Sequence, residues 1–81
     1  MTPEQCFLHD VIERLVTEAR AASNARKNSA INRTKEQIAF DEGRSIAYYE
    51  VVSTFLNQAK VFGLSYEHLP ALNFDPDREL L

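Results

Sequence analysis

The chain has 81 residues, of which 44% are hydrophobic and 26% charged, and its formal net charge is −3. This composition is that of one globular domain, residues 1–81, and a domain of this length buries only about 60% of its unfolded surface on folding. A lone copy is therefore expected to be marginally stable. The acidic balance excludes a chain-wide basic footprint for nucleic acid, and the single cysteine, Cys6, excludes an internal disulfide scaffold.

Membrane and secretory signals do not occur in the sequence. No apolar run is long enough for a transmembrane helix. The first residues also lack the positive region and the long apolar run of a secretory signal. We therefore expect a cytoplasmic protein without a membrane partner.

The first predicted element is a helix that begins near Thr2, with Pro3 at its first position and Glu4 in its first turn. Proline is preorganised for that position, and an acid suits the positive end of the helix dipole. Apolar residues then recur at spacings of three and four, which predicts one apolar stripe. The stripe comprises Phe7, Leu8, Val11, Ile12, Leu15, Val16, Ala19 and Ala22.

A turn is predicted at residues 24–33, NARKNSAINR, where three asparagines and a serine favour local hydrogen bonds over helix. Ile31 matches the apolar pattern of the following segment, so Asn28 and Ser29 are alternative starts for the second helix. The turn predicts an antiparallel helical hairpin.

The second predicted helix spans residues 34–62 and would be the longest element. Thr34 and Gln37 fit a capping box at its start, and Gly63 stands where a left-handed residue would end it. Gly43 lies inside it, at a cost of about 1 kcal/mol relative to alanine. It marks either a close helix crossing or a tolerated weak point.

This second helix carries two apolar stripes when its residues are placed at about 100° intervals. The first contains Ile38, Ala39, Ile46, Tyr49, Val52 and Leu56. The second stripe, expected nearly opposite, contains Phe40, Ala47, Val51, Phe55 and Phe62, with Arg44, Tyr48 and Gln58 on it or beside it. A hairpin partner covers one stripe, and a second copy of the hairpin would cover the other and complete a four-helix bundle. The predicted dimer interface is Phe40, Arg44, Ala47, Val51, Phe55 and Phe62.

The last segment is expected to pack across the bundle as a tail. Ser65 is a candidate cap for a short turn that Pro70 ends, and Asp75 with Pro76 signals another turn or helix start. We expect Leu72 and Phe74 to be buried, because so short a chain can hardly leave them exposed.

Positive charge gathers around the predicted turn, where residues 19–35 hold five cations and no acid. Arg26, Lys27, Arg33 and Lys35 are candidates for contacting phosphates or another acidic surface. A solvated helix end is the competing interpretation, because cations are favourable at a helix C-terminus.

Catalytic and cofactor signatures are weak. Cys6, His9, Asp10 and Glu13 lie within two helical turns and resemble metal ligands, but bundle metal sites draw ligands from several helices, so solvated polar residues are expected. No nucleophile–base constellation and no glycine-rich phosphate loop can be assembled from this sequence. The prediction is a protein that is not an enzyme, with no cofactor and no metal.

Taken together, these features predict an all-α fold: a two-helix antiparallel hairpin with a short C-terminal helical turn and tail, dimerising into a four-helix bundle. The predicted function is a non-enzymatic interaction or structural module that acts as a homodimer, with another protein as a further candidate partner. The alternative is a small regulator that binds nucleic acid or an acidic protein through the basic turn.

Overall fold

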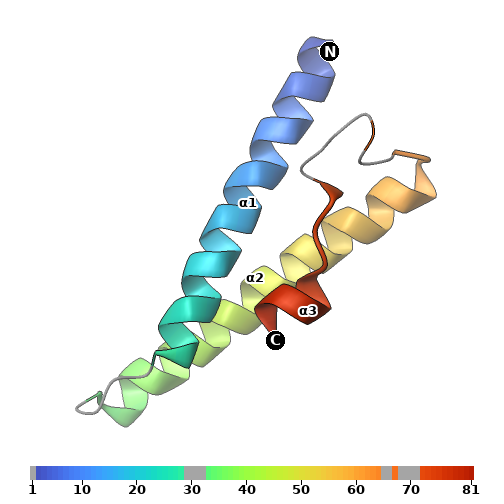
Figure 1. The fold of residues 1–81 in the computed structure, drawn as a ribbon. Coiled ribbons are helices and arrows are strands. Elements are labelled where there is room, and N and C mark those ends of the chain that lie inside the picture. The colour runs from blue at the N-terminus through green and yellow to red at the C-terminus, as the bar shows by residue number, and fades with distance from the viewer. Residues whose placement is uncertain (1, 29–32, 65–66, 68–71) are drawn as a thin grey trace.

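The computed structural model describes residues 2–28, 33–64, 67 and 72–81. Its helices are α1 (Pro3–Lys27), α2 (Lys35–Val61) and α3 (Pro76–Leu80), and these described residues contain no strand. Figure 1 shows α1 and α2 as an antiparallel hairpin with the short α3 lying against it. The molecule measures 47 × 20 × 16 Å along its principal axes. The predicted all-α hairpin with a short C-terminal helix is confirmed.

Both long helices begin at a capping box. The hydroxyls of Thr2 and Thr34 accept hydrogen bonds from the backbone N–H groups of Gln5 and Gln37, at 3.2 and 3.1 Å. The glutamine side chains accept in return from the threonine N–H groups at 2.9 and 3.0 Å. A start of the second helix at residue 28 or 29 is therefore wrong, because the threonine at position 34 has an extended backbone and caps the helix. Residues 29–32 of the predicted turn lie outside the described part of the chain.

The C-terminus of α2 is closed by Gly63, whose φ of 75° lies in the left-handed region. This turn lets the N–H of Leu64 donate to the carbonyl of Ala59 at 2.9 Å, while the N–H of Gly63 donates to the carbonyl of Lys60 at 3.0 Å. The pair of bonds is a Schellman motif, which satisfies carbonyls that the helix end would leave free. The predicted glycine stop is confirmed.

The core lies between α1, α2 and α3. Ala19, Ala22 and Ser23 of α1 and Ser45 of α2 are buried, and such small residues allow the helices to approach closely. The larger buried side chains form one cluster with Leu80 of α3. They are Ile12, Val16, Val52 and Leu56.

The buried face of α2 differs from the predicted first stripe. Val52 and Leu56 are buried as expected, but Ala39 is exposed and Ile46 is 54% exposed. Ser45 takes the buried place instead. The reason is angular: position 45 precedes Val52 by seven residues, nearly two full turns, whereas position 46 points about 120° away.

The tail is held against both long helices. Leu80 is only 1% exposed, and its carbonyl accepts from Ser23 Oγ at 3.2 Å and from Arg26 at 3.3 Å. Arg20 pairs with Glu79 at 3.0 Å. The expected packing of the tail across the hairpin is confirmed by these contacts.

The finer predictions for the tail have mixed outcomes. Leu72 and Phe74 are partly rather than fully buried against the core. The helix start at Asp75 and Pro76 is confirmed, since α3 begins there. The predicted turn capped by Ser65 and ended by Pro70 lies outside the described residues.

Gly43 does not mark a helix crossing. A Cβ atom built on it would meet nothing within 4 Å beyond its own helix. The buried small side chains lie elsewhere, at Ala19, Ala22, Ser23 and Ser45. Gly43 is therefore a tolerated weak point on the surface of α2.

Candidate interaction surface

The second stripe of α2 is largely open to solvent. Phe40 is 68% exposed, Val51 49% and Phe62 76%, and Ala47 is also exposed. Single exposed apolar residues are ordinary, but a row of large ones along one helix face marks a surface suited to burial against a partner. Val51 is exposed whereas its neighbour Val52 is buried, because one residue step along a helix rotates the side chain by about 100°.

The stripe is hollowed toward the C-terminal end of α2, where a shallow groove of about 640 Å³ runs along the helix. Its lining is mainly apolar or uncharged, with Glu50 as its one charged residue. The lining residues are Glu50, Val51, Thr54, Phe55, Gln58, Ala59, Phe62 and Leu64. An apolar side chain could insert into this groove.

Two of the six predicted interface residues also serve the fold of a single copy. Phe55 is half-buried and packs against the core cluster. Arg44 pairs with Glu18 of α1 at 3.4 Å, and its guanidinium lies 5.4 Å from the centre of the Tyr48 ring. The second stripe therefore adjoins the buried face of α2 on one side instead of lying opposite to it, which corrects the predicted placement.

Leu64 belongs to this surface and was not among the predicted interface residues. The Schellman turn at Gly63 brings Leu64 back toward Ala59, so that it lines the groove beside Phe62. The sequence signal was the glycine stop followed by a leucine, since a hydrophobic residue commonly follows such a stop and packs on the last turn.

The predicted basic contact residues divide into two pairs. Arg26 is half-buried and donates to the Leu80 carbonyl, and Arg33 pairs with Asp41 and donates to the Ala25 carbonyl at 3.3 Å. Lys27 and Lys35 are exposed. Two of the four cations thus stabilise the fold, and two face solvent at the tip of the hairpin.

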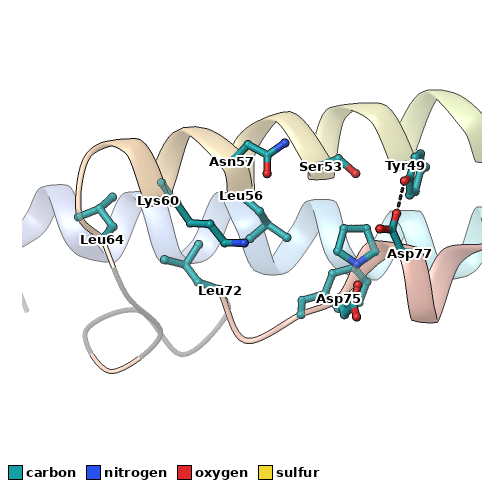
Figure 2. A pocket seen from close by; sticks show the side chains of 12 residues that line it. Tyr49, Ser53, Leu56, Asn57, Lys60, Leu64, Leu72, Asp75 and Asp77 are labelled. Carbon is teal, nitrogen blue, oxygen red and sulfur yellow. Dashed lines mark hydrogen bonds between the residues drawn. The ribbon is translucent and has the colours of Figure 1, made fainter.

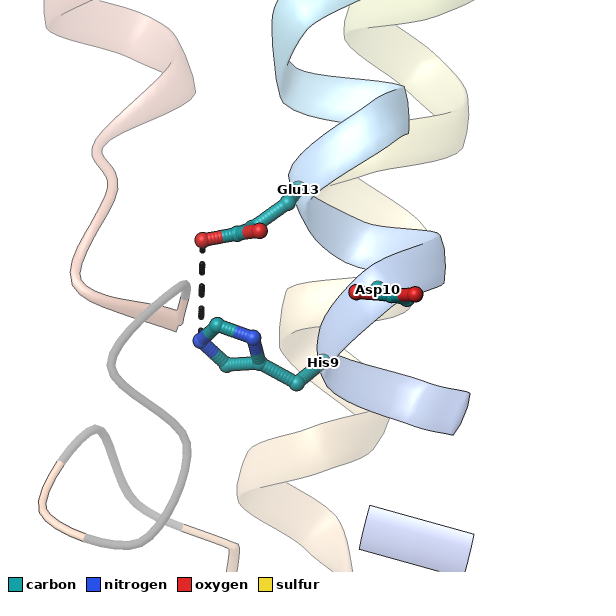
Figure 3. Close-up of side chains that lie close together, drawn as sticks. All are labelled: His9, Asp10 and Glu13. Atoms are coloured by element: carbon teal, nitrogen blue, oxygen red, sulfur yellow. Dashed lines mark ion pairs between the residues drawn. The ribbon is translucent and has the colours of Figure 1, made fainter. Parts of the chain in front are cut away.

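The acidic and histidine residues near the start of α1 lie close together on one helix (Figure 3). His9, Asp10 and Glu13 each have a potential ligand atom within 4.8 Å of the others, and His9 Nε2 lies 3.8 Å from Glu13 Oε1. The expectation of a solvated side chain is wrong for His9, because its side chain is only 19% exposed. All three potential ligands come from α1, and Asp10 and Glu13 are exposed.

A cleft of about 590 Å³ separates the C-terminal half of α2 from the tail. Leu56 and Leu72 line its apolar wall, and the Tyr49 hydroxyl donates to the Asp77 carboxylate at one end (Figure 2). This hydrogen bond raises the pKa of Tyr49 above its ordinary 10.0, because ionised tyrosine could no longer donate to the carboxylate. We interpret the cleft as part of the contact between α2 and the tail.

Comparison with family models, curated proteins and solved structures gives no match for this chain. Among the helices of the described residues, none has both the length and the apolarity that crossing a bilayer requires.

Proposed function

We propose that this protein is a non-enzymatic interaction or structural module that acts as a homodimer through the second stripe of α2. The observation that carries the proposal is the exposure of Phe40, Val51 and Phe62 in a single copy. The described part of the tail leaves these side chains exposed, and its Leu80 packs with Val52 and Leu56 in the core instead. A partner surface is needed to remove this stripe from water.

The stripe is large enough to support association. Burial of a large apolar side chain contributes roughly 1.5–3 kcal/mol, so three such residues from each copy would contribute on the order of 10 kcal/mol before costs. The loss of translational and rotational freedom opposes association by an estimated 4–15 kcal/mol. Gains from the half-buried Phe55 and from Leu64 add to the favourable side. Pairing of two hairpins would form a four-helix bundle, a frequent solution for helices of this length.

The structure offers a matched pair of residues for the test. Val51 and Ile46 are both β-branched, are 49% and 54% exposed, and lie on the same helix. They point in directions about 140° apart, so only Val51 belongs to the second stripe. Val51→Glu should place a charge in the interface, while Ile46→Glu should place one in solvent.

Analytical ultracentrifugation at micromolar concentration, with circular dichroism to confirm folding, provides the measurement. We expect the wild-type chain and Ile46→Glu to sediment as dimers and Val51→Glu as a folded monomer of 9.3 kDa. A Val51→Glu variant that keeps the wild-type mass would contradict the proposed surface. Phe55→Glu is a poorer probe, because Phe55 also packs on the core of its own copy.

The alternative, a regulator that binds nucleic acid or an acidic protein through the basic tip, has less support. Arg26 and Arg33 already make intramolecular bonds, which leaves Lys27 and Lys35 as the exposed cations of the predicted set. If this alternative holds, salt-dependent retention on nucleic acid should fall when these lysines are changed to glutamine. Equal retention of wild type and variant would exclude the nucleic-acid form of this alternative.

A further inference from the structure

Apart from Tyr48, which has the polar Thr54 as its counterpart three residues beyond Val51, the positions of the second stripe and its neighbours Arg44 and Gln58 have a symmetric spacing. They are Phe40, Arg44, Ala47, Val51, Phe55, Gln58 and Phe62. Counted from Val51, these positions lie 4, 7 and 11 residues away on both sides. Reversing the direction of the helix about Val51 therefore superposes the set on itself.

From this spacing we infer that two copies pair antiparallel along α2, with a two-fold axis at Val51; the inference rests on the proposed homodimer. The axis would bring Phe40 of each copy against Phe62 of the other. Val51 would meet its own counterpart at the centre. An isologous interface requires such self-complementarity, because each surface must match its own reversed copy.

The straightness of the row supports a long contact. Phe40, Val51 and Phe62 follow one another at 11-residue steps, which is three helical turns with a drift of only about 20°. Each step covers about 16 Å, so the row extends for about 33 Å along a molecule 47 Å long. Two nearly straight helices can therefore keep all three contacts at once.

Side-chain size also favours the antiparallel register. The axis places Ala47 opposite Phe55 of the other copy, so that a small side chain leaves room for a large one. A parallel, in-register pairing would set Ala47 against Ala47, which leaves a gap, and Phe55 against Phe55, which crowds the same face. Cavities and overpacking both destabilise an apolar contact.

Charge gives an independent reason. In the antiparallel register Arg44 lies opposite the uncharged Gln58, and its own guanidinium stays paired with Glu18. A parallel pairing would instead bring two Arg44 side chains together and place both basic tips, with Lys27 and Lys35, at one end of the dimer. Like charges in a partly dehydrated contact oppose association.

Spin-label distances separate the two registers. Cysteine introduced singly at Glu36 or at Glu50, both exposed, can carry a nitroxide in a Cys6→Ser background, which removes the exposed native thiol. In the antiparallel dimer the two labels at position 50 lie about 3 Å apart along the helix axis, and those at position 36 about 45 Å apart. In a parallel dimer the axial separation is near zero at both positions.

A short inter-label distance at position 50 with a long one at position 36 is the expected result. Short distances at both positions, in a sample that sediments as a dimer, would overturn the antiparallel register while leaving the proposed homodimer intact. A wild-type chain that sediments as a monomer would overturn the homodimer and the register together.

Disulfide cross-linking between two variants provides a second readout if a spin label weakens association. Arg44→Cys and Gln58→Cys, each in the Cys6→Ser background, would be mixed and oxidised. The antiparallel register predicts mainly the mixed disulfide between the two variants. Cross-linking of each variant only to itself would overturn it.

Discussion

The two apolar faces of α2 differ in what covers them. The buried face, with Val52 and Leu56, is closed by small and medium side chains of α1 and by Leu80 of the tail. The second stripe presents larger groups, Phe40 and Phe62, to solvent. Hydrophobicity alone therefore does not determine which face a hairpin buries; the side that α1 can approach closely does. The larger residues are left exposed in the single copy.

The largest expected effect comes from the tail, where Leu80 and Leu81 are adjacent but 1% and 63% exposed. Leu80→Ala should lower the free energy of unfolding by roughly 2–5 kcal/mol, because it removes buried contacts and leaves a cavity. Leu81→Ala should change it by less than about 0.5 kcal/mol. Urea denaturation followed by circular dichroism measures both. Similar losses in the two variants would contradict the docked position of α3.

Val51 and Val52 of α2 test the difference between the second stripe and the buried face most closely. Val52→Ala should cost roughly 2 kcal/mol at every protein concentration, because it removes two buried methyl groups inside one copy. Val51→Ala should act mainly on association, so its effect on the melting temperature should be largest at high protein concentration and should shrink as the protein is diluted and the dimer dissociates. Thermal melts over a hundredfold concentration range distinguish the two. A concentration-independent effect of Val51→Ala would argue against a role in the dimer.

Gly43 lies outside both faces and provides a test with the opposite sign. Gly43→Ala should raise the free energy of unfolding by about 0.5–1 kcal/mol, because the position is helical and the added methyl meets open space. Chemical denaturation is the measurement, and the sedimentation of the variant should match that of the wild type. A destabilised variant would mean that this side of α2 is in close contact.

The smallest effect concerns pH. The pKa of Tyr49 is raised above 10.0 by its bond to Asp77, so the folded state holds this proton more tightly than the unfolded state. The stability that this contributes is fully present below about pH 10 and should be lost as pH rises through the higher folded-state pKa. Tyr49→Phe should remove this part of the alkaline slope. An absorbance titration of tyrosinate checks the direction, and an unshifted Tyr49 would contradict the bond.

Local signals in the sequence predicted the helix ends well. Thr2, Thr34 and Gly63 act through hydrogen bonds within a few residues, so their roles can be recognised without knowledge of the rest of the fold. The choice between Ser45 and Ile46 as the buried residue could not be predicted in this way. It depends on how closely α1 approaches, which is a property of the packed pair.

The residues of the candidate surface could also be selected from the sequence, because helical spacing is a local signal. The apolar spacing identified Phe40, Val51 and Phe62, and each is exposed in the folded chain. The spacing could not show that Arg44 is held by Glu18, because that ion pair joins residues 26 positions apart. It also could not show that Arg26 donates to the Leu80 carbonyl, or that Arg33 donates to the Ala25 carbonyl and pairs with Asp41.

We propose above that a second copy of this chain covers the second stripe of α2. Sedimentation equilibrium of the unmodified protein, from about 1 to 100 μM, tests it directly. We expect a mass approaching twice 9.3 kDa, with a reversible decline on dilution. A mass of 9.3 kDa throughout that range would contradict it.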